Sequence, residues 1–114
     1  MKKDDRVYPR HILDAIEHIE KYAKVTEDYE DFCKNEMAHD AVIRQLGIIG
    51  EAAKRVSTTV KDKASEVPWK DVTGMRDKLI HDYFGIDLTA VWKAAKEDIP
   101  ILKRQVQECL KELA

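Results

Sequence analysis

The stretch that decides the fold is residues 37–56, MAHDAVIRQLGIIGEAAKRV. Its apolar residues recur every three or four positions, in the series Val42, Leu46, Ile49, Ala53 and Val56. This spacing places them on one face of an α-helix and predicts the longest continuous helix of the chain. Gly47 and Gly50 lie inside it, and each costs about 1 kcal/mol relative to alanine in an exposed helix interior. We therefore expect another helix to approach closely there, within the fold or across a dimer.

Two amphipathic segments precede this helix. Ile12, Ile16 and Ile19 share one face of a predicted helix over 9–23. A short helix follows, and we expect Thr26 to be its N-cap.

The segments after residue 56 contain the helix-breaking residues. Residues 57–67 predict a loop with room for one helical turn, and Pro68 then opens a helix that Gly85 ends. Asp87 is expected to cap the next helix. Because Pro100 lacks an N–H and clashes with the preceding turn, a new helix capped by Asp98 is expected there.

Composition supports this series of helices. Hydrophobic residues make up 44% and charged residues 37%, with only 4 Gly and 3 Pro, and no strand pattern is visible. The chain is therefore predicted to be one domain, residues 1–114, with an all-α fold: an antiparallel bundle of about five helices. The formal net charge of −2 gives no overall basic surface, so any nucleic-acid site must be local.

Membrane and disulfide signals are weak. No apolar run reaches the roughly 18 residues that a membrane span needs, and no signal-peptide core follows the N-terminus. Cys33 and Cys109 fit no metal-ligand spacing, and two free thiols are expected rather than a disulfide. These features predict a soluble, cytoplasmic protein without cofactor or metal.

The strongest chemical signal is Arg76-Asp77-Lys78-Leu79-Ile80-His81-Asp82-Tyr83. Arginine can bind phosphate bidentately, and histidine can transfer protons near neutral pH. On a continuous helix, however, His81 would lie about 140° around the axis from Arg76 and about 7.5 Å along it. Spacing alone leaves a second interpretation open: an arginine at the border of the apolar face, a histidine near a helix C-terminus and a tyrosine in the core.

The number of proton-transferring groups limits how this motif could cleave RNA. Metal-free cleavage of RNA by the neighbouring 2′-hydroxyl needs one group to accept a proton and another to donate one. Each chain supplies one motif histidine, so a catalytic interpretation of His81 favours a homodimer with two-fold symmetry.

The whole chain resembles the HepT-like toxins of the HEPN superfamily, which are small all-helical ribonucleases. The similarity runs through the following blocks: Ile12-Leu13-Asp14-Ala15-Ile16, Ala41-Val42-Ile43-Arg44-Gln45-Leu46, Ile49-Gly50-Glu51-Ala52, Pro68-Trp69, Met75-Arg76-Asp77, His81-Asp82-Tyr83-Phe84-Gly85-Ile86-Asp87, Val91-Trp92 and Asp98-Ile99-Pro100. These blocks occur in the family's order, which is more specific than the central motif alone.

The resemblance implies a homodimeric, metal-independent endoribonuclease, the toxin of a type VII-like toxin–antitoxin system. Arg76 and His81 would be its catalytic residues. Asp77, which is part of the superfamily pattern, and Tyr83, which could donate a hydrogen bond to the phosphate, would be auxiliary. The partner antitoxin would be a minimal nucleotidyltransferase, which silences the toxin by transferring AMP to Tyr83 (AMPylation).

Other candidate residues carry weaker signals. Glu51 could orient Arg76, or it could be a solvated acid. Lys54 and Arg55 belong to a basic stretch that could contact the RNA backbone, although such runs are usually solvated helix faces. His11 and His18 lack further ligands at metal-binding spacing and are expected to be surface histidines.

The acidic stretch over 26–40 would repel RNA and could face a basic partner protein. The alternative function is a non-catalytic helical adaptor that binds a nucleotidyltransferase. The acidic pI favours this adaptor, whereas the intact Arg–His pair favours the enzyme. A metal-binding four-helix bundle is set aside, because inward Glu-x-x-His pairs are lacking.

Overall fold

The computed structural model describes residues 4–75, 77, 80–81 and 85–113. The elements in these ranges are α1 (Val7–Lys24), α2 (Tyr29–Lys34), α3 (Glu36–Arg55), α4 (Thr58–Lys63), α5 (Trp69–Thr73), β1 (Ile80–His81), β2 (Gly85–Ile86), α7 (Leu88–Lys93), the π-helical turn η1 (Ala94–Asp98) and α8 (Ile99–Leu113). The all-α prediction is confirmed, with one very short β-hairpin added to it. No helix among the described residues is long and apolar enough to cross a bilayer.

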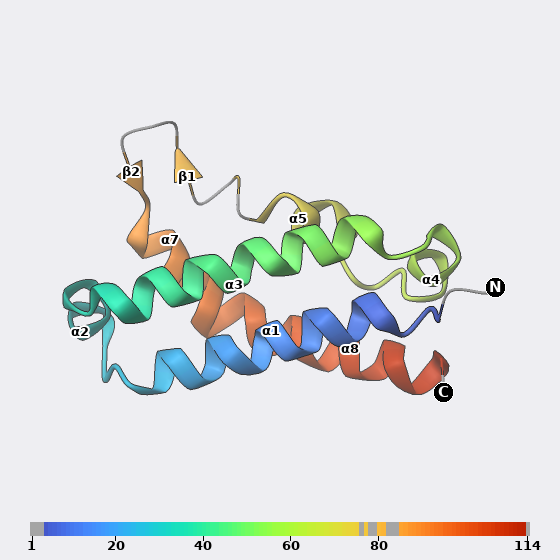
Figure 1. Cartoon of the computed structure of the whole chain (residues 1–114), viewed down its shortest axis with the longest axis horizontal. Coiled ribbons are helices and arrows are strands. Elements are labelled where there is room, and N and C mark those ends of the chain that lie inside the picture. The colour runs from blue at the N-terminus through green and yellow to red at the C-terminus, as the bar shows by residue number, and fades with distance from the viewer. Residues whose placement is uncertain (1–3, 76, 78–79, 82–84, 114) are drawn as a thin grey trace.

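The long helices form two layers (Figure 1). Helices α1 and α3 pack side by side and antiparallel, while α7, η1 and α8 lie behind them. Helix α5 packs on α3 along the edge away from α1, and the hairpin lies on that same side. Helix α1 begins and α8 ends at the same end of the molecule.

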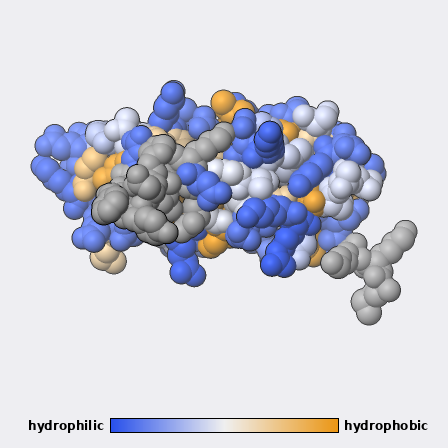
Figure 2. Space-filling view, turned by 90° about the horizontal axis from the view of Figure 1, so that it is seen from above, coloured by the Kyte–Doolittle hydropathy of each residue, from blue (hydrophilic) through white to orange (hydrophobic). Residues whose placement is uncertain are grey.

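The core fills the space between these layers. Ile12, Ile16 and Ile19 of α1 are completely buried, as are Leu46 and Ile49 of α3. Each of these series has the spacing of one helix face, so burying the faces against each other stabilises the α1–α3 pair. Figure 2, which looks onto the side with α5 and the hairpin, shows hydrophilic residues over most of the surface and hydrophobic ones in small groups.

Helix α3 matches its prediction within one residue at each end. Gly50 is buried, and a Cβ built on it would lie 3.0 Å from the carbonyl oxygen of Thr73. The close approach expected at this glycine is therefore confirmed within the fold, and the approaching element is the C-terminal end of α5.

The expected cap of α2 is wrong. Asp28 is the N-cap, and its carboxylate accepts a hydrogen bond from the Asp31 N–H at 2.9 Å. Thr26 is buried instead, where its hydroxyl donates to the carbonyl oxygen of Ala23 at 2.8 Å. The Thr26 side chain therefore adds a second hydrogen bond to a carbonyl that the Thr26 N–H also reaches at the end of α1, and it does not cap α2.

The loop expected over 57–67 contains the helical turn that the pattern allowed. Ser57 caps α4 by accepting from the Val60 N–H at 3.2 Å, and Val60 is buried. The two cysteines are free, as predicted.

The continuous helix expected from Pro68 to Gly85 is wrong. Helix α5 ends at Thr73, and Gly74 follows with φ −89° and ψ 6°, outside the α-helical range. Farther along, residues 80–81 and 85–86 pair as strands. Glycine is a weak helix former, and α5 is little more than one turn long. The helix therefore ends before Gly74.

The separate helix expected at Asp98 is also wrong. Asp98 is the last residue of η1, and the chain continues directly into α8 with Pro100 in its first turn. The π-helical turn accommodates the proline without breaking the helix.

Candidate functional site

The motif segment links α5 to α7 through the hairpin. Ile80 pairs with Ile86 and His81 pairs with Gly85, in antiparallel register. The backbone of His81 therefore lies in a strand at the edge of the α-bundle and not on a helix. The β-branched side chains of Ile80 and Ile86 favour this extended conformation.

The remaining motif residues are described only in part. Asp77 has helical conformation and an exposed side chain. Arg76 and Tyr83 lie outside the described residues, so their predicted roles stay predictions. The side chain of His81 is likewise not described.

The chain before the motif is held firmly against the bundle. The indole N–H of Trp69 donates to the carbonyl oxygen of Ala64 at 3.0 Å. Val72 is buried, and Gly50 of α3 lies against the end of α5. Helix α5 therefore has a fixed position up to three residues before Arg76.

The chain after the hairpin is anchored as well. Asp87 caps α7 as predicted, accepting from the Ala90 N–H at 3.0 Å. The hydroxyl groups of Tyr29 and Thr89 are 2.9 Å apart and hydrogen-bonded. The rings of Phe32 and Trp92 pack with their centroids 5.0 Å apart. Both ends of the motif segment are thus attached to rigid helices, as a precise site requires.

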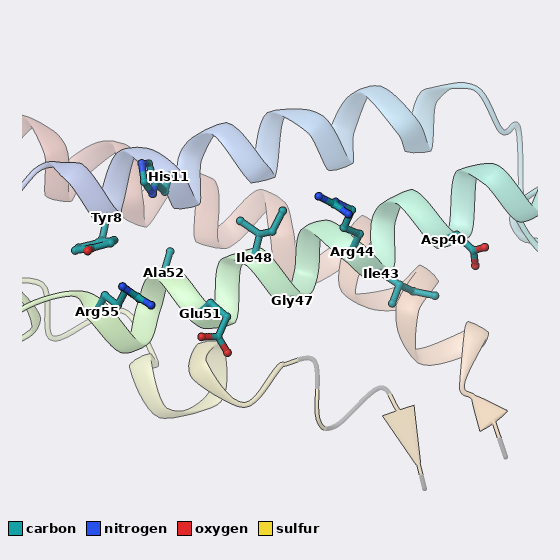
Figure 3. Close-up of a pocket in the computed structure, with 10 residues that line it drawn as sticks. All are labelled: Tyr8, His11, Asp40, Ile43, Arg44, Gly47, Ile48, Glu51, Ala52 and Arg55. Carbon is teal, nitrogen blue, oxygen red and sulfur yellow. The ribbon is translucent and has the colours of Figure 1, made fainter. Parts of the chain in front are cut away.

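An open groove of about 900 Å³ runs along the face of α3 next to the start of α1 (Figure 3). It is lined by Tyr8, His11, Asp40, Ile43, Arg44, Gly47, Ile48, Glu51, Ala52 and Arg55. The hairpin projects from the bundle on the side of α3 away from α1, and no described hairpin residue lines the groove (Figure 3).

The charged residues of the groove alternate in sign along α3. Asp40, Arg44, Glu51 and Arg55 are all exposed. Among the described residues, neither arginine has an ion-pair partner. The groove therefore offers two unpaired cations, each accompanied by a carboxylate on the same face.

A second groove, of about 610 Å³, lies between α5 and the α7–α8 layer and includes Met75, next to Arg76. Its charged residues are Glu66, Asp71, Asp98 and Lys93.

The weaker candidates from the sequence, Glu51, Lys54 and Arg55, all lie on α3. Glu51 pairs with Lys54 at 3.4 Å, and both side chains are more than half exposed. Arg55 lies at the end of the α3 groove. Orientation of Arg76 by Glu51 stays a prediction, because Arg76 is outside the described residues.

The histidines of α1 are exposed, as expected. The ring of His11 packs edge-on against Tyr8, and His18 stacks on Tyr22. The described part of the chain contains no group of three or more side chains arranged to hold a metal ion.

Sequence reasoning missed the alternating charges of the groove. Asp40 and Arg44 were not identified as site residues, although they precede Glu51 and Arg55 on the same helix face. The signal that could have found them is the spacing of charge along the polar side of the predicted helix.

Comparison with known proteins gives a consistent result. The family model described as "Ribonuclease HepT-like" matches residues 12–109. The chain is 43% identical to "Probable ribonuclease HepT" of Thermococcus cleftensis, over 97% of this chain and 100% of that protein. It is 40% identical to "Putative RNase MJ0125" of Methanocaldococcus jannaschii, over 98% of this chain and 96% of that protein.

A two-function relative matches over part of its length. The chain is 46% identical to "Gamma-glutamylcyclotransferase and putative RNase MJ0434" of M. jannaschii, over 99% of this chain. The chain spans 50% of the length of that protein. No solved structure matches the chain.

Proposed function

Because the chain belongs to the Ribonuclease HepT-like family, we propose that it is a metal-independent endoribonuclease, the toxin of a type VII-like toxin–antitoxin system. The observation that carries this proposal is the similarity to proteins named as ribonucleases across nearly the full chain. The anchoring of the motif segment by α5 and α7 is consistent with a site that needs fixed geometry.

The reaction divides between two motif residues. Arg76 binds the scissile phosphate and stabilises the negative charge that develops on it. His81 accepts the proton of the 2′-hydroxyl, whose oxygen attacks phosphorus. The bond to the 5′-oxygen breaks, and that oxygen takes a proton from a second acid. The products are a 2′,3′-cyclic phosphate and a free 5′-hydroxyl.

A second copy of the chain supplies the second acid. In a two-fold dimer, one His81 acts as base while the partner's His81, in its protonated form, acts as acid. The proposed site is therefore a composite of two chains. Asp77 has an auxiliary role beside the catalytic pair, and its exposed side chain leaves it accessible from solvent.

Tyr83 is the proposed point of control. Its hydroxyl oxygen attacks the α-phosphorus of ATP held by the nucleotidyltransferase, and pyrophosphate leaves. The attached AMP places a negative phosphate beside Arg76, where it competes with RNA for the same cation. Silencing by occupation then needs no large conformational change.

The surface charges suggest further contacts of this cytoplasmic protein. Lys54 is proposed to approach the RNA backbone, because it is an exposed cation at the end of α3. The exposed carboxylates around α2 are proposed to face a basic partner protein, since they would repel RNA.

Cleavage of single-stranded RNA in EDTA tests the enzyme against the adaptor alternative. Wild type is expected to cleave, and Arg76→Ala and His81→Ala are each expected to lose at least about 100-fold in rate. Arg104→Ala and His18→Ala are matched controls, because both residues are exposed and lie on α8 and α1. A dimeric wild type that leaves RNA intact would instead support the non-catalytic adaptor.

AMP transfer is tested separately with the nucleotidyltransferase and ATP. We expect wild type to gain the mass of one AMP per chain and to lose cleavage, whereas Tyr83→Phe should keep its mass and its activity. A Tyr83→Phe protein that is still silenced by partner catalysis contradicts modification at this residue.

A further inference from the structure

The charges on the open face of α3 have a symmetry of their own. Asp40 stands eight positions before Ile48, and Arg55 stands eight positions after Gly47. Arg44 stands four positions before Ile48, and Glu51 stands four positions after Gly47. Reversing the direction of α3 about the midpoint between Gly47 and Ile48 therefore places each acid opposite an arginine.

From this pattern we propose that the open face of α3 pairs antiparallel with the same face of a second copy of the chain. In this pairing, Arg44 faces the partner's Glu51 and Asp40 faces the partner's Arg55, and two-fold symmetry repeats both contacts. The inference rests on the proposed function in one respect. The composite active site needs a homodimer, and the inference specifies the interface of that homodimer.

The centre of the α3 face is suited to a close crossing of two helices. Gly47 has no side chain, and small residues let the backbones of crossing helices approach. Ile48 beside it is 37% exposed and offers apolar surface at the centre of this face. Ile43 and Ala52 are likewise symmetric about the midpoint, which gives the crossing an apolar border.

The contacts within one chain leave these charges available. Arg44 and Arg55 have no ion-pair partner among the described residues. Among the described residues Glu51 pairs with Lys54, at 3.4 Å, and both side chains are mostly exposed, so exchanging this ion pair for another costs little. Asp40 lies 3.2 Å from the ring nitrogen Nδ1 of His39, and most of its side chain is exposed to solvent.

A second copy suits this face better than RNA does. Asp40 and Glu51 are interleaved with the two arginines along the same groove, and a phosphate backbone tracking the arginines would meet both acids. The alternating signs match instead a surface with the same alternation in reverse order. The proposal therefore assigns Arg55 to the partner's Asp40 in preference to RNA.

The pairing also arranges the motif segments. The two-fold axis of an antiparallel, face-to-face helix pair lies in the contact plane and runs perpendicular to both helices. The hairpin lies on the edge of α3 away from α1 (Figure 3). Rotation about such an axis keeps both hairpins on one edge of the α3–α3 pair, as a composite site requires.

Charge reversal tests the pairing, with dimer dissociation measured by sedimentation equilibrium. Arg44→Glu turns two attractive contacts of the symmetric dimer into repulsive ones, and Glu51→Arg does the same. Each is expected to raise the dissociation constant by about tenfold to a hundredfold. The double variant R44E/E51R restores opposite charges at both contacts and is expected to return close to the wild-type value. Arg104→Glu, an exposed reversal on α8, is the control and should dimerise like wild type.

Three outcomes would overturn the α3 pairing. Single reversals that dimerise as tightly as Arg104→Glu would place the interface elsewhere. A double variant that is folded by circular dichroism yet stays monomeric would refute the specific contact of Arg44 with Glu51. Reversals that stay dimeric and lose RNA binding would assign the groove to RNA and equally overturn the pairing. Cleavage by wild type in EDTA is scored separately, so the α3 interface can fail while the ribonuclease proposal stands.

Discussion

Replacing Gly50 with alanine tests how α3 positions the segment that leads to the motif. Alanine is favoured over glycine inside a helix by about 1 kcal/mol. The new Cβ, however, would lie 3.0 Å from the Thr73 carbonyl oxygen, which is backbone and cannot rotate away. Overpacking of this kind costs about 1–3 kcal/mol. We expect Gly50→Ala to lower the free energy of unfolding by up to about 2 kcal/mol.

Gly47→Ala is the matched control. Gly47 lies three positions earlier in the same helix and lines the open groove, so it gains the same helix propensity without the Thr73 contact. The difference between the two alanine variants, about 1–3 kcal/mol, then isolates the contact. Both variants are built on Arg44→Glu, so that association through α3 does not enter the comparison. Urea denaturation followed by circular dichroism measures the difference.

The same substitution has a functional consequence. Moving Thr73 away from α3 displaces the chain three residues before Arg76, so RNA cleavage by Gly50→Ala in the wild-type background is expected to fall more than stability alone explains. Equal unfolding free energies for the two alanine variants would refute the reasoning. That result would mean that α5 moves away from α3 at no cost.

Two smaller predictions concern the anchors and the thiols. Asp87→Ala removes the side-chain acceptor for the Ala90 N–H and should lower the free energy of unfolding by about 1 kcal/mol. Asp87→Asn keeps an acceptor and should lower it less. Equal losses of stability in thermal denaturation would contradict the capping role of Asp87. Burial, and secondarily the nearby carboxylates of Glu112 and Glu66, raise the pKa of the Cys109 thiol, so it stays protonated to higher pH than an ordinary cysteine. A thiol reagent should therefore label the half-buried Cys33 first at neutral pH and label Cys109 only on unfolding or at higher pH; simultaneous labelling of native protein would contradict this order.

The helices were predictable where one apolar face carries the signal. The series from Val42 to Val56 located α3 within one residue at each end, because a single stripe buried against α1 determines the helix. Gly50 also predicted the close approach of another helix, although the sequence did not indicate that this helix would be α5. The spacing of apolar residues along a helix can be seen in a short stretch of sequence. Which other helix packs against it depends on the fold of the whole chain.

The hairpin was not predictable by the same means. A strand of two residues is too short to show an alternating pattern, and the apolar residues Trp69 and Val72 share helix spacing with later residues of the motif. The stop at Gly74 depends on how α5 packs against α3 at Gly50. Pro100 correctly predicted an irregularity in the last helix. The form of that irregularity, a π-helical turn that contains the buried Ala94 and Ala95, could not be predicted from the sequence.

The hairpin changes the reasons for expecting a dimer. On a continuous helix, His81 would point about 140° away from Arg76, which argued that one copy could not close a site. His81 lies in a strand paired with Gly85, so that angular argument no longer applies. Two independent reasons remain: one motif histidine per chain cannot act as both base and acid in the same step, and the charges of α3 are complementary to their own reversed order. The first reason concerns the chemistry of cleavage and the second concerns the surface of α3, and both support the proposed dimer.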